Sequence, residues 1–342
     1  MIPRLELAGG YGISRLVKGG WHLAGGHGEV DAGRAVRDMA GFVDAGITTF
    51  DCADIYTGVE ELIGRFRREF PEHARRVRVH TKFVPDLDDL GRVDARYVEA
   101  IVDRSLARLG MERLDLVQFH WWDYAVPRYV EVALQLERLR RAGKIDRIGL
   151  TNFGTPQVRE LLDAGVPVFA HQLQYSLLDD RPAHGMAQLC AERGIALLCY
   201  GTVAGGFLSE RWLGAPAPPP PLANRSLTKY RLIIDEFGGW APFQELLRVL
   251  HAIAGRHDCD IATVATRVVL DLPGVAAAIV GATSTAHLAA HLRIGELALT
   301  AADRAAIAAA TAGRRGPPGD VYELERDREG PHGRIMKYGL NK

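Results

Sequence analysis

The sequence predicts an α/β protein of the (β/α)8 TIM barrel class, with an N-terminal β-hairpin before the barrel and a C-terminal tail after it. Short apolar segments alternate with amphipathic ones eight times, and strands that alternate with helices favour a parallel sheet covered by helices. The 342 residues suit a single barrel domain, 1–342. No G-x-G-x-x-G motif lies between a strand and a helix, which weakens the alternative of an open, doubly wound sheet.

Each element follows from a local pattern. Apolar alternation around Gly9 and Gly10 predicts a hairpin within residues 1–16, with strands at 4–7 and 13–16. Further strands are expected at 17–21, 48–51, 77–83, 114–120, 145–151, 168–174, 196–200 and 276–280. Helices are expected at 31–45, 60–70, 95–109, 128–141, 156–164, 184–192, 243–255, 261–270 and 285–292. The extra helix falls in the seventh unit, so eight strand–helix pairs remain.

Two segments depart from this alternation. Residues 202–239 contain the proline run 216–221 and are too long for an ordinary loop, so they are expected to form a functional or mobile insertion. Residues 313–342 are charged and rich in Gly and Pro, and they are expected to wrap the barrel as a tail.

Composition narrows the class of protein. Lys+Arg and Asp+Glu are equal at 42 each, so no net charge indicates a nucleic acid or a membrane as a partner. The four cysteines form no C-x-x-C pair, which fits a reduced, cytoplasmic location. Residues 1–10 carry no apolar signal segment, and no apolar run is long enough to span a membrane. Nothing in the sequence indicates an oligomeric state.

Polar residues that suit carbonyl chemistry fall at the predicted strand ends, where barrel active sites lie. Asp51 and Tyr56 follow the second barrel strand, Lys82 lies in the third, and His120 ends the fourth. Tyr56 is expected to be the proton donor, with its pKa lowered by Lys82, which Asp51 keeps charged. His120 would orient the carbonyl or share the proton. Each residue taken singly is better explained by a turn, an ordinary tyrosine, a solvated side chain or core packing, and only the four together favour the functional interpretation.

Four motifs in order resemble the aldo-keto reductase superfamily over nearly the whole chain. They are Phe50-Asp51-Cys52-Ala53-Asp54-Ile55-Tyr56, Thr81-Lys82, Leu114-Asp115-Leu116-Val117-Gln118-Phe119-His120-Trp121 and Gly149-Leu150-Thr151-Asn152-Phe153. The resemblance implies an NAD(P)H-dependent oxidoreductase that transfers hydride between a nicotinamide cofactor and a carbonyl or alcohol. It implies the same four catalytic residues, no metal, and no glycine-rich phosphate motif.

The resemblance also implies a cofactor site. Thr151, Asn152 and Gln172 would bind the carboxamide, and Tyr200 would stack on the nicotinamide. The loop 201–208, with Gly201, Val203 and Gly205, would contact the diphosphate. At the adenosine end the corresponding residues are Gly281, Thr283, Ser284, His287 and His291, with Thr283 at the usual arginine position. Because a bidentate arginine is the strong phosphate partner, the choice between NADP(H) and NAD(H) stays open.

The expected substrate is a small-molecule carbonyl or alcohol; sugars and secondary metabolites are candidates, and the direction stays open. Substrate contacts are expected from Trp21, His22, Ile55, Trp121, Trp122 and the insertion. Two interpretations of the tryptophans have equal weight, a wall against the substrate or a plug that anchors the tail. The alternative function is a regulatory barrel that binds nicotinamide with little or no turnover. A barrel isomerase or lyase would need a base or metal on the last strands, and the sequence shows none there.

Overall fold

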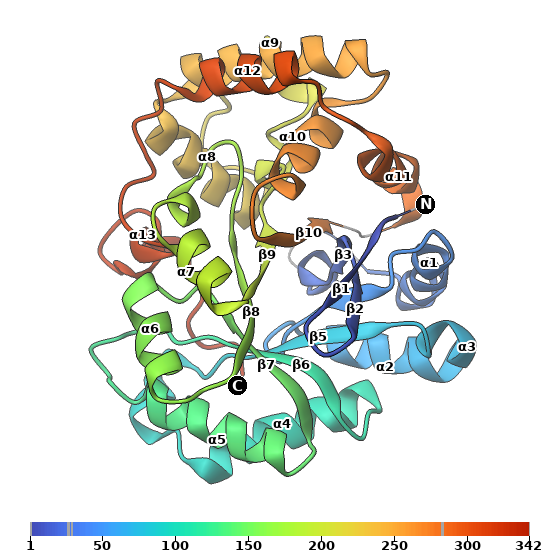
Figure 1. Ribbon diagram of the computed structural model, residues 1–342, viewed down its shortest axis with the longest axis vertical. Coiled ribbons are helices and arrows are strands. Elements are labelled where there is room, and N and C mark those ends of the chain that lie inside the picture. Colours follow the sequence, from blue (N-terminus) through green and yellow to red (C-terminus); the bar gives the residue numbers. More distant parts are fainter. Residues whose placement is uncertain (1, 26–27, 29, 282–283, 342) are drawn as a thin grey trace.

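The computed structural model describes residues 2–25, 28, 30–281 and 284–341. Eight parallel strands close into a barrel in the order β10, β3, β4, β5, β6, β7, β8, β9, with helices outside (Figure 1), which confirms the predicted (β/α)8 fold. The barrel strands are β3 (Leu16–Gly19), β4 (Thr49–Asp51), β5 (Arg78–Phe83), β6 (Leu114–Phe119), β7 (Ile145–Thr151), β8 (Val168–Gln174), β9 (Ala196–Tyr200) and β10 (Val275–Gly281).

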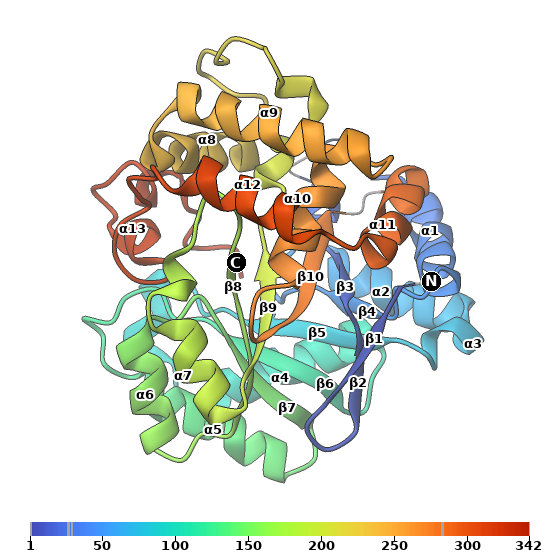
Figure 2. The same cartoon turned by 45° about the horizontal axis from the view of Figure 1, so that its top comes forward.

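A β-hairpin precedes the barrel, as the sequence predicted. It consists of β1 (Arg4–Leu7) and β2 (Tyr11–Ser14), which pair antiparallel and lie beside the barrel strands in Figure 2. Tyr11 and Ile13 of the hairpin join the cluster of buried side chains inside the barrel, with Leu116 and Leu198. The hairpin is therefore packed against residues of the barrel strands.

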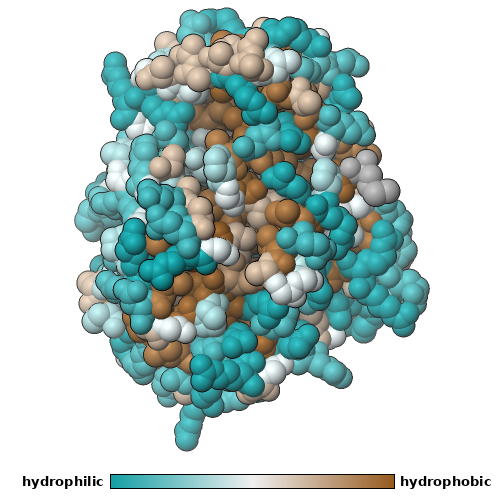
Figure 3. Space-filling view, viewed as in Figure 1, coloured by the Kyte–Doolittle hydropathy of each residue, from teal (hydrophilic) through white to brown (hydrophobic). Residues whose placement is uncertain are grey.

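The covering helices begin and end at residues that the sequence marks. Asp94 caps α4 by accepting a hydrogen bond from Tyr97 N at 2.8 Å, and Gly110 ends it in the left-handed conformation. The helices are α1 (Ala32–Asp44), α2 (Val59–Glu69), α3 (Pro71–Ala74), α4 (Ala95–Leu109), α5 (Tyr129–Arg141), α6 (Thr155–Asp163), α7 (Met186–Arg193), α9 (Trp240–Arg256), α10 (Ile261–Leu270) and α11 (Leu288–Glu296). On the face shown in Figure 3, hydrophilic side chains cover much of the rim and hydrophobic ones gather toward the middle.

Besides the four-residue α3, two longer helices were not predicted. The insertion contains α8 (Arg225–Phe237), and α12 (Ala301–Thr311) follows α11. The sequence carries signals for both. In α8 the buried residues Tyr230, Ile233, Ile234 and Phe237 have helical spacing, and in α12 a capping box joins Thr300 and Asp303. The proline run before α8 obscured its pattern, so the interpretation of 202–239 as a functional or mobile insertion overlooked this helix.

The tail crosses the molecule as expected and carries a short helix, α13 (Glu323–Arg326). Arg326 holds it in place: its guanidinium donates to the carbonyl oxygens of Trp121, Trp122 (2.8 Å) and Asn152 (2.6 Å). The same group lies 4.0 Å above the ring of Tyr124. These contacts fix the tail over the carboxyl ends of β6 and β7. Among the described residues, no helix is long and apolar enough to cross a membrane.

Candidate active site

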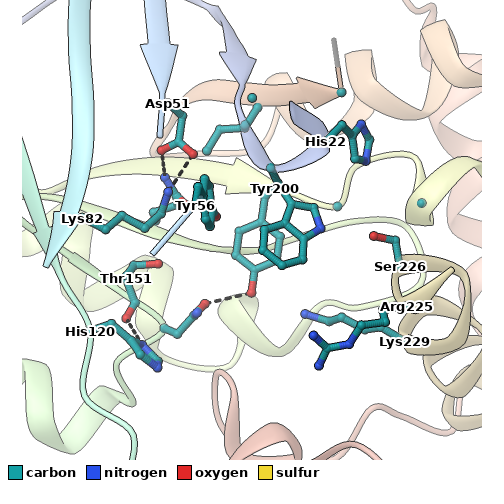
Figure 4. A pocket seen from close by; sticks show the side chains of 18 of the residues that line it. His22, Asp51, Tyr56, Lys82, His120, Thr151, Tyr200, Arg225, Ser226 and Lys229 are labelled. Atoms are coloured by element: carbon teal, nitrogen blue, oxygen red, sulfur yellow. Dashed lines mark hydrogen bonds and ion pairs between the residues drawn. The ribbon is translucent and has the colours of Figure 1, made fainter. Parts of the chain in front are cut away.

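The four residues expected to be catalytic meet at the carboxyl ends of neighbouring strands (Figure 4). Asp51 is the last residue of β4, Lys82 lies in β5, and His120 directly follows β6. Tyr56 lies in the turn between β4 and α2, where its backbone N–H donates to Ala53 O at 3.0 Å. All four line one cavity of about 290 Å³.

Lys82 occupies the centre of the group. Its Nζ donates to Asp51 Oδ2 at 2.7 Å and to Cys52 O at 2.8 Å, and it lies 4.8 Å from the centroid of the Tyr56 ring. Burial alone would lower the pKa of Lys82, but Asp51 and Tyr56 outweigh it and raise that pKa. Lys82 therefore stays a cation beside the phenol.

Tyr56 differs from expectation in its pKa. Burial raises the pKa of the phenol, and the opposing effect of Lys82 is smaller, so the pKa is raised rather than lowered. The expectation of a lowered pKa considered the charge of Lys82 without the loss of solvent around the hydroxyl. A protonated phenol still suits a proton donor, because the donor must hold its proton until the carbonyl oxygen takes it.

Asp51 is held by more than Lys82. Its Oδ1 accepts from Gln172 Nε2 at 2.6 Å and from Gln118 Nε2 at 3.1 Å, and Gln172 also donates to Gln118 Oε1 at 2.9 Å. Gln118 was not predicted as part of the site, although it lies in the motif that ends at His120. Gln172 lines the cavity, but its amide N–H groups are engaged with these two side chains, so its carbonyl oxygen is the group left to meet a ligand.

His120 is neutral and lines the cavity. Burial, together with the nearby charge of Arg326, lowers the pKa of His120 to about 3. Its Nδ1 lies 3.2 Å from Thr151 O, a contact drawn in Figure 4. Since a carbonyl oxygen only accepts, Nδ1 carries the proton and Nε2 keeps a lone pair. Nε2 is buried, with no hydrogen-bond partner among the described residues.

These protonation states predict the pH dependence of carbonyl reduction. The active form has Tyr56 protonated, and its raised pKa places the loss of that proton above the ordinary value of about 10. His120 is already neutral above pH 4, because its pKa is about 3. We expect kcat/KM for reduction to be flat between about pH 5 and 9 and to fall only at higher pH. An inflection near pH 6 to 7 that disappears in His120→Gln would contradict this.

Residues expected to hold the nicotinamide surround the same cavity. Tyr200 donates its hydroxyl proton to Asn152 Oδ1 at 2.8 Å, and Thr151, Asn152, Gln172 and Tyr200 all line the cavity. Asn152 adopts a left-handed φ of 62°, which is uncommon for a residue other than glycine. An aromatic ring beside side-chain amides offers stacking and both hydrogen-bonding roles, so the residues present fit a nicotinamide carboxamide.

The loop after β9 fits a diphosphate. Gly201 and Gly205 have φ of 77° and 63°, and a Cβ on either would lie 2.5 Å or 2.7 Å from atoms of Tyr230. Gly201, Val203 and Gly205 line the cavity, as do Tyr230 of α8 and three further residues of that helix, Arg225, Ser226 and Lys229. Figure 4 shows these three extending from α8 toward the cavity beside Tyr200. The sequence did not indicate them, because their helix was not predicted.

The expected adenosine residues are only partly placed at this cavity. Gly281 lines it, and a Cβ there would lie 2.7 Å from the ring of His22. Thr283 lies outside the described residues. The three others do not line the cavity: the side chain of Ser284 accepts from Ala286 N, His287 precedes α11, and His291 is buried near Phe42 with ring centroids 6.4 Å apart.

The residues expected to contact substrate separate into two groups. Trp21, His22, Ile55 and Trp122 line the cavity; the Trp21 ring lies 5.1 Å from that of Tyr56, and the Trp122 ring 4.2 Å from that of His120. Trp121 was expected to face substrate, and this needs correction. It is fully buried and does not line the cavity, and its indole N–H donates to Asp123 O and Val126 O. Adjacent residues after a strand face opposite sides, so only one of the pair reaches the cavity.

The tail supplies part of the cavity wall. Tyr322, Ile335, Met336, Lys337 and Leu340 line it, and Arg225 of α8 donates to Ile335 O. Trp122 combines the two roles between which the sequence left a choice, because it lines the cavity and also packs on Tyr338, with ring centroids 5.1 Å apart. No cluster of potential metal ligands occurs in the part of the chain that the structure describes.

Comparisons with known proteins agree with this geometry. The sequence profile described as the aldo/keto reductase family matches residues 15–312. Flagellar radial spoke protein 5 of Chlamydomonas reinhardtii is 32% identical over 64% of this chain and 49% of its own length. Aldo-keto reductase yakc [NADP(+)] of Schizosaccharomyces pombe is 33% identical over 62% of this chain and 64% of its own. The chain thus covers about half of the first relative and just under two thirds of the second.

A solved structure has the same fold. Glycerol dehydrogenase AKR11B4 from Gluconobacter oxydans superposes with a TM-score of 0.77, covering 93% of this chain and 97% of the other, at 22% sequence identity.

Proposed function

The chain belongs to the aldo/keto reductase family, and from this premise we propose that it is an NAD(P)H-dependent oxidoreductase that acts on a small carbonyl or alcohol with Tyr56 as the general acid and base. When bound, the nicotinamide supplies or accepts the hydride. Tyr56 delivers a proton to the carbonyl oxygen in reduction and removes it in oxidation. Lys82 stabilises the phenolate form of Tyr56, and Asp51 keeps Lys82 charged. The barrel, residues 1–342, serves as a single catalytic domain.

The observation that carries this proposal is the position of Lys82. Its ammonium bridges a buried carboxylate at 2.7 Å and the face of the Tyr56 ring at 4.8 Å. A lysine with a raised pKa stays charged next to the phenol, and its charge stabilises the phenolate that forms when Tyr56 gives up its proton. A lysine with a purely structural role would not need this position.

For the cofactor we propose that both NADP(H) and NAD(H) support turnover. Arg225 and Lys229 supply positive charge beside the glycine loop after β9, where either nucleotide carries its diphosphate. Residues 284–291 include no arginine that could hold a 2′-phosphate in a bidentate manner.

The substrate we propose is small and partly polar. A cavity of about 290 Å³ is at the lower end of ligand sites, and cofactor and substrate share it. Its lining combines the aromatic rings of Trp21, Trp122 and Tyr322 with the imidazole of His120, which suits a short sugar or a polar secondary metabolite. We propose a cytoplasmic enzyme, in line with four cysteines that are all free thiols.

One observation favours a second candidate function. The relative that is 32% identical is named a flagellar radial spoke protein, and this name states no reaction. The second candidate is a barrel that binds a nicotinamide nucleotide and has little or no turnover.

A turnover assay separates the two functions. We expect the full chain to change absorbance at 340 nm steadily with NADPH or NADH and a panel of short aldehydes and ketones, and in reverse with NADP⁺ or NAD⁺ and alcohols. Cofactor binding measured by the fluorescence of the cavity tryptophans runs in parallel. Binding without turnover across the whole panel would favour the second candidate and contradict the proposed enzyme.

A further inference from the structure

The chain turns after β7 at residues 152–155, and this corner carries Asn152 of the nicotinamide site. Asn152 lines the cavity and has a left-handed φ of 62°. A residue with a Cβ keeps such a conformation only where its surroundings fix it. The partners of the backbone groups at this corner therefore decide where the Asn152 side chain lies.

The barrel fixes the first amides of the corner. The backbone N–H of Asn152 donates to Gln172 O at 2.9 Å, and that of Phe153 donates to His171 Nε2 at 3.1 Å. Both acceptors lie in β8. The side chain is held as well, because Tyr200 donates its hydroxyl proton to Asn152 Oδ1 at 2.8 Å. These contacts leave the carbonyl oxygen of Asn152 to another partner.

The tail supplies the partners for the rest of the corner. Arg326 donates to Asn152 O at 2.6 Å and, with its other terminal nitrogen, to Trp122 O at 2.8 Å. Asp320 accepts from the backbone N–H of Thr155 at 2.5 Å and from its hydroxyl at 3.0 Å. Thr155 is the first residue of α6. Residues at least 165 positions further along the chain thus close the corner at both ends.

Arg326 is well suited to hold a backbone in one conformation. Its guanidinium is a planar fork with donors at fixed angles, and a hydrogen bond from a charged donor is stronger than one between neutral groups. The fork is itself oriented, since it lies 4.0 Å from the centroid of the Tyr124 ring. The hydroxyl of Tyr124 accepts from Gly154 N at 3.0 Å, so the arginine and the ring contact the same corner.

We propose that Arg326 and Asp320 are positioning residues for the cofactor, and that they hold Asn152 where its side-chain amide pairs with the carboxamide of the nicotinamide. Neither residue lines the cavity, so both act through the corner and not by touching the ligand. A docked tail thereby becomes a condition for tight binding of the nicotinamide half of the cofactor. This inference rests on the proposed function, because it needs a nicotinamide in this cavity.

The test compares two ligands that differ only in the carboxamide: NADP⁺, and its analogue with an unsubstituted pyridinium ring in place of nicotinamide. Dissociation constants for the full-length protein are measured by tryptophan fluorescence. We expect the wild type to bind NADP⁺ more tightly than the analogue. In Arg326→Met the ratio of the two constants should fall by roughly 3- to 10-fold, as for one lost hydrogen bond between neutral groups. In Asp320→Ala it should fall by at least about 2-fold, because Asp320 holds only the far end of the corner.

An exposed arginine of the tail gives the matched control. The side chain of Arg334 is 68% exposed, lies 3.7 Å from Glu329 and does not line the cavity. Arg334→Met should therefore keep the ratio of the wild type.

The pattern of the two dissociation constants decides the outcome. If both rise by the same factor in Arg326→Met, the tail has only a general structural role and the inference is wrong. Unchanged constants in that variant, or a wild type that binds both ligands equally well, would also overturn it. Should Arg326→Met fail to fold, a wild-type ratio in Asp320→Ala has the same meaning. A wild type that binds neither ligand would instead contradict the proposed function.

Discussion

Replacing Tyr56 with phenylalanine should lower kcat for carbonyl reduction by about 10²- to 10⁴-fold, the usual range for loss of a general acid. The variant keeps the ring that lies 4.8 Å from Lys82 Nζ and 5.1 Å from Trp21, so the shape of the cavity is retained. Only the proton that the carbonyl oxygen needs is removed. The rate is measured at 340 nm with saturating cofactor and the best substrate of the panel, and cofactor affinity by fluorescence titration.

Tyr97→Phe is the matched control, because Tyr97 is a partly exposed tyrosine of α4 that does not line the cavity. It should keep wild-type kcat, and both variants should bind cofactor as the wild type does. Turnover in Tyr56→Phe within a few-fold of the wild type would show that another group protonates the product, and the proposed role of Tyr56 would be wrong.

The sequence was sufficient to predict this part of the site for a geometric reason. In a parallel barrel the carboxyl ends of all strands meet at one face, so Asp51, Lys82 and His120 had to converge once the strands were placed. The registers bear this out: Asp51 lies opposite His80 of β5, and Lys82 opposite Gln118 of β6. The local sequence pattern predicted the strands, and the parallel topology of the barrel brings their carboxyl ends together.

The remaining wall of the cavity depends on contacts that leave no periodic pattern. Tyr322 and Met336 come from a charged, Gly- and Pro-rich tail, and only tertiary contacts bring them to the barrel mouth. Trp121 was misjudged for a related reason, since two consecutive tryptophans look alike in a sequence but face different sides. The pKa of Tyr56 likewise depends on how much solvent the folded chain removes, which the identity of its neighbours does not reveal.

A buried ion cluster that fastens the tail should make Arg181 the most important residue for stability outside the hydrophobic core. Arg181 is 2% exposed and lies between two fully buried carboxylates, at 2.8 Å from Asp179 Oδ2 and 3.0 Å from Glu325 Oε2. Lys229 adds a weaker contact to Glu325 at 3.6 Å. Burial would raise the pKa of Glu325, but Arg181 and Lys229 lower it to about 2, so the carboxylate is charged at neutral pH.

Arg181→Met should therefore lower the free energy of unfolding by about 3–5 kcal/mol at pH 7.5, because two carboxylates stay buried without their main partner. Urea denaturation followed by tryptophan fluorescence measures the change. Arg96→Met, on the exposed side of α4, is the control and should stay within about 0.5 kcal/mol of the wild type. A loss below about 1 kcal/mol for Arg181→Met would mean that the cluster does not hold the tail.

The pH dependence and a double variant identify the cause of that loss. In the wild type the lowered pKa of Glu325 contributes stability that is present above about pH 4.5 and is lost as pH falls toward 2. In Arg181→Met the pKa of Glu325 should rise instead, so the defect should shrink as the pH is lowered toward 5 and Glu325 takes up a proton.

Adding Glu325→Gln to Arg181→Met removes one uncompensated charge, and the double variant should be more stable than Arg181→Met alone. A double variant as unstable as the sum of the single changes would show that Arg181 acts through packing rather than charge.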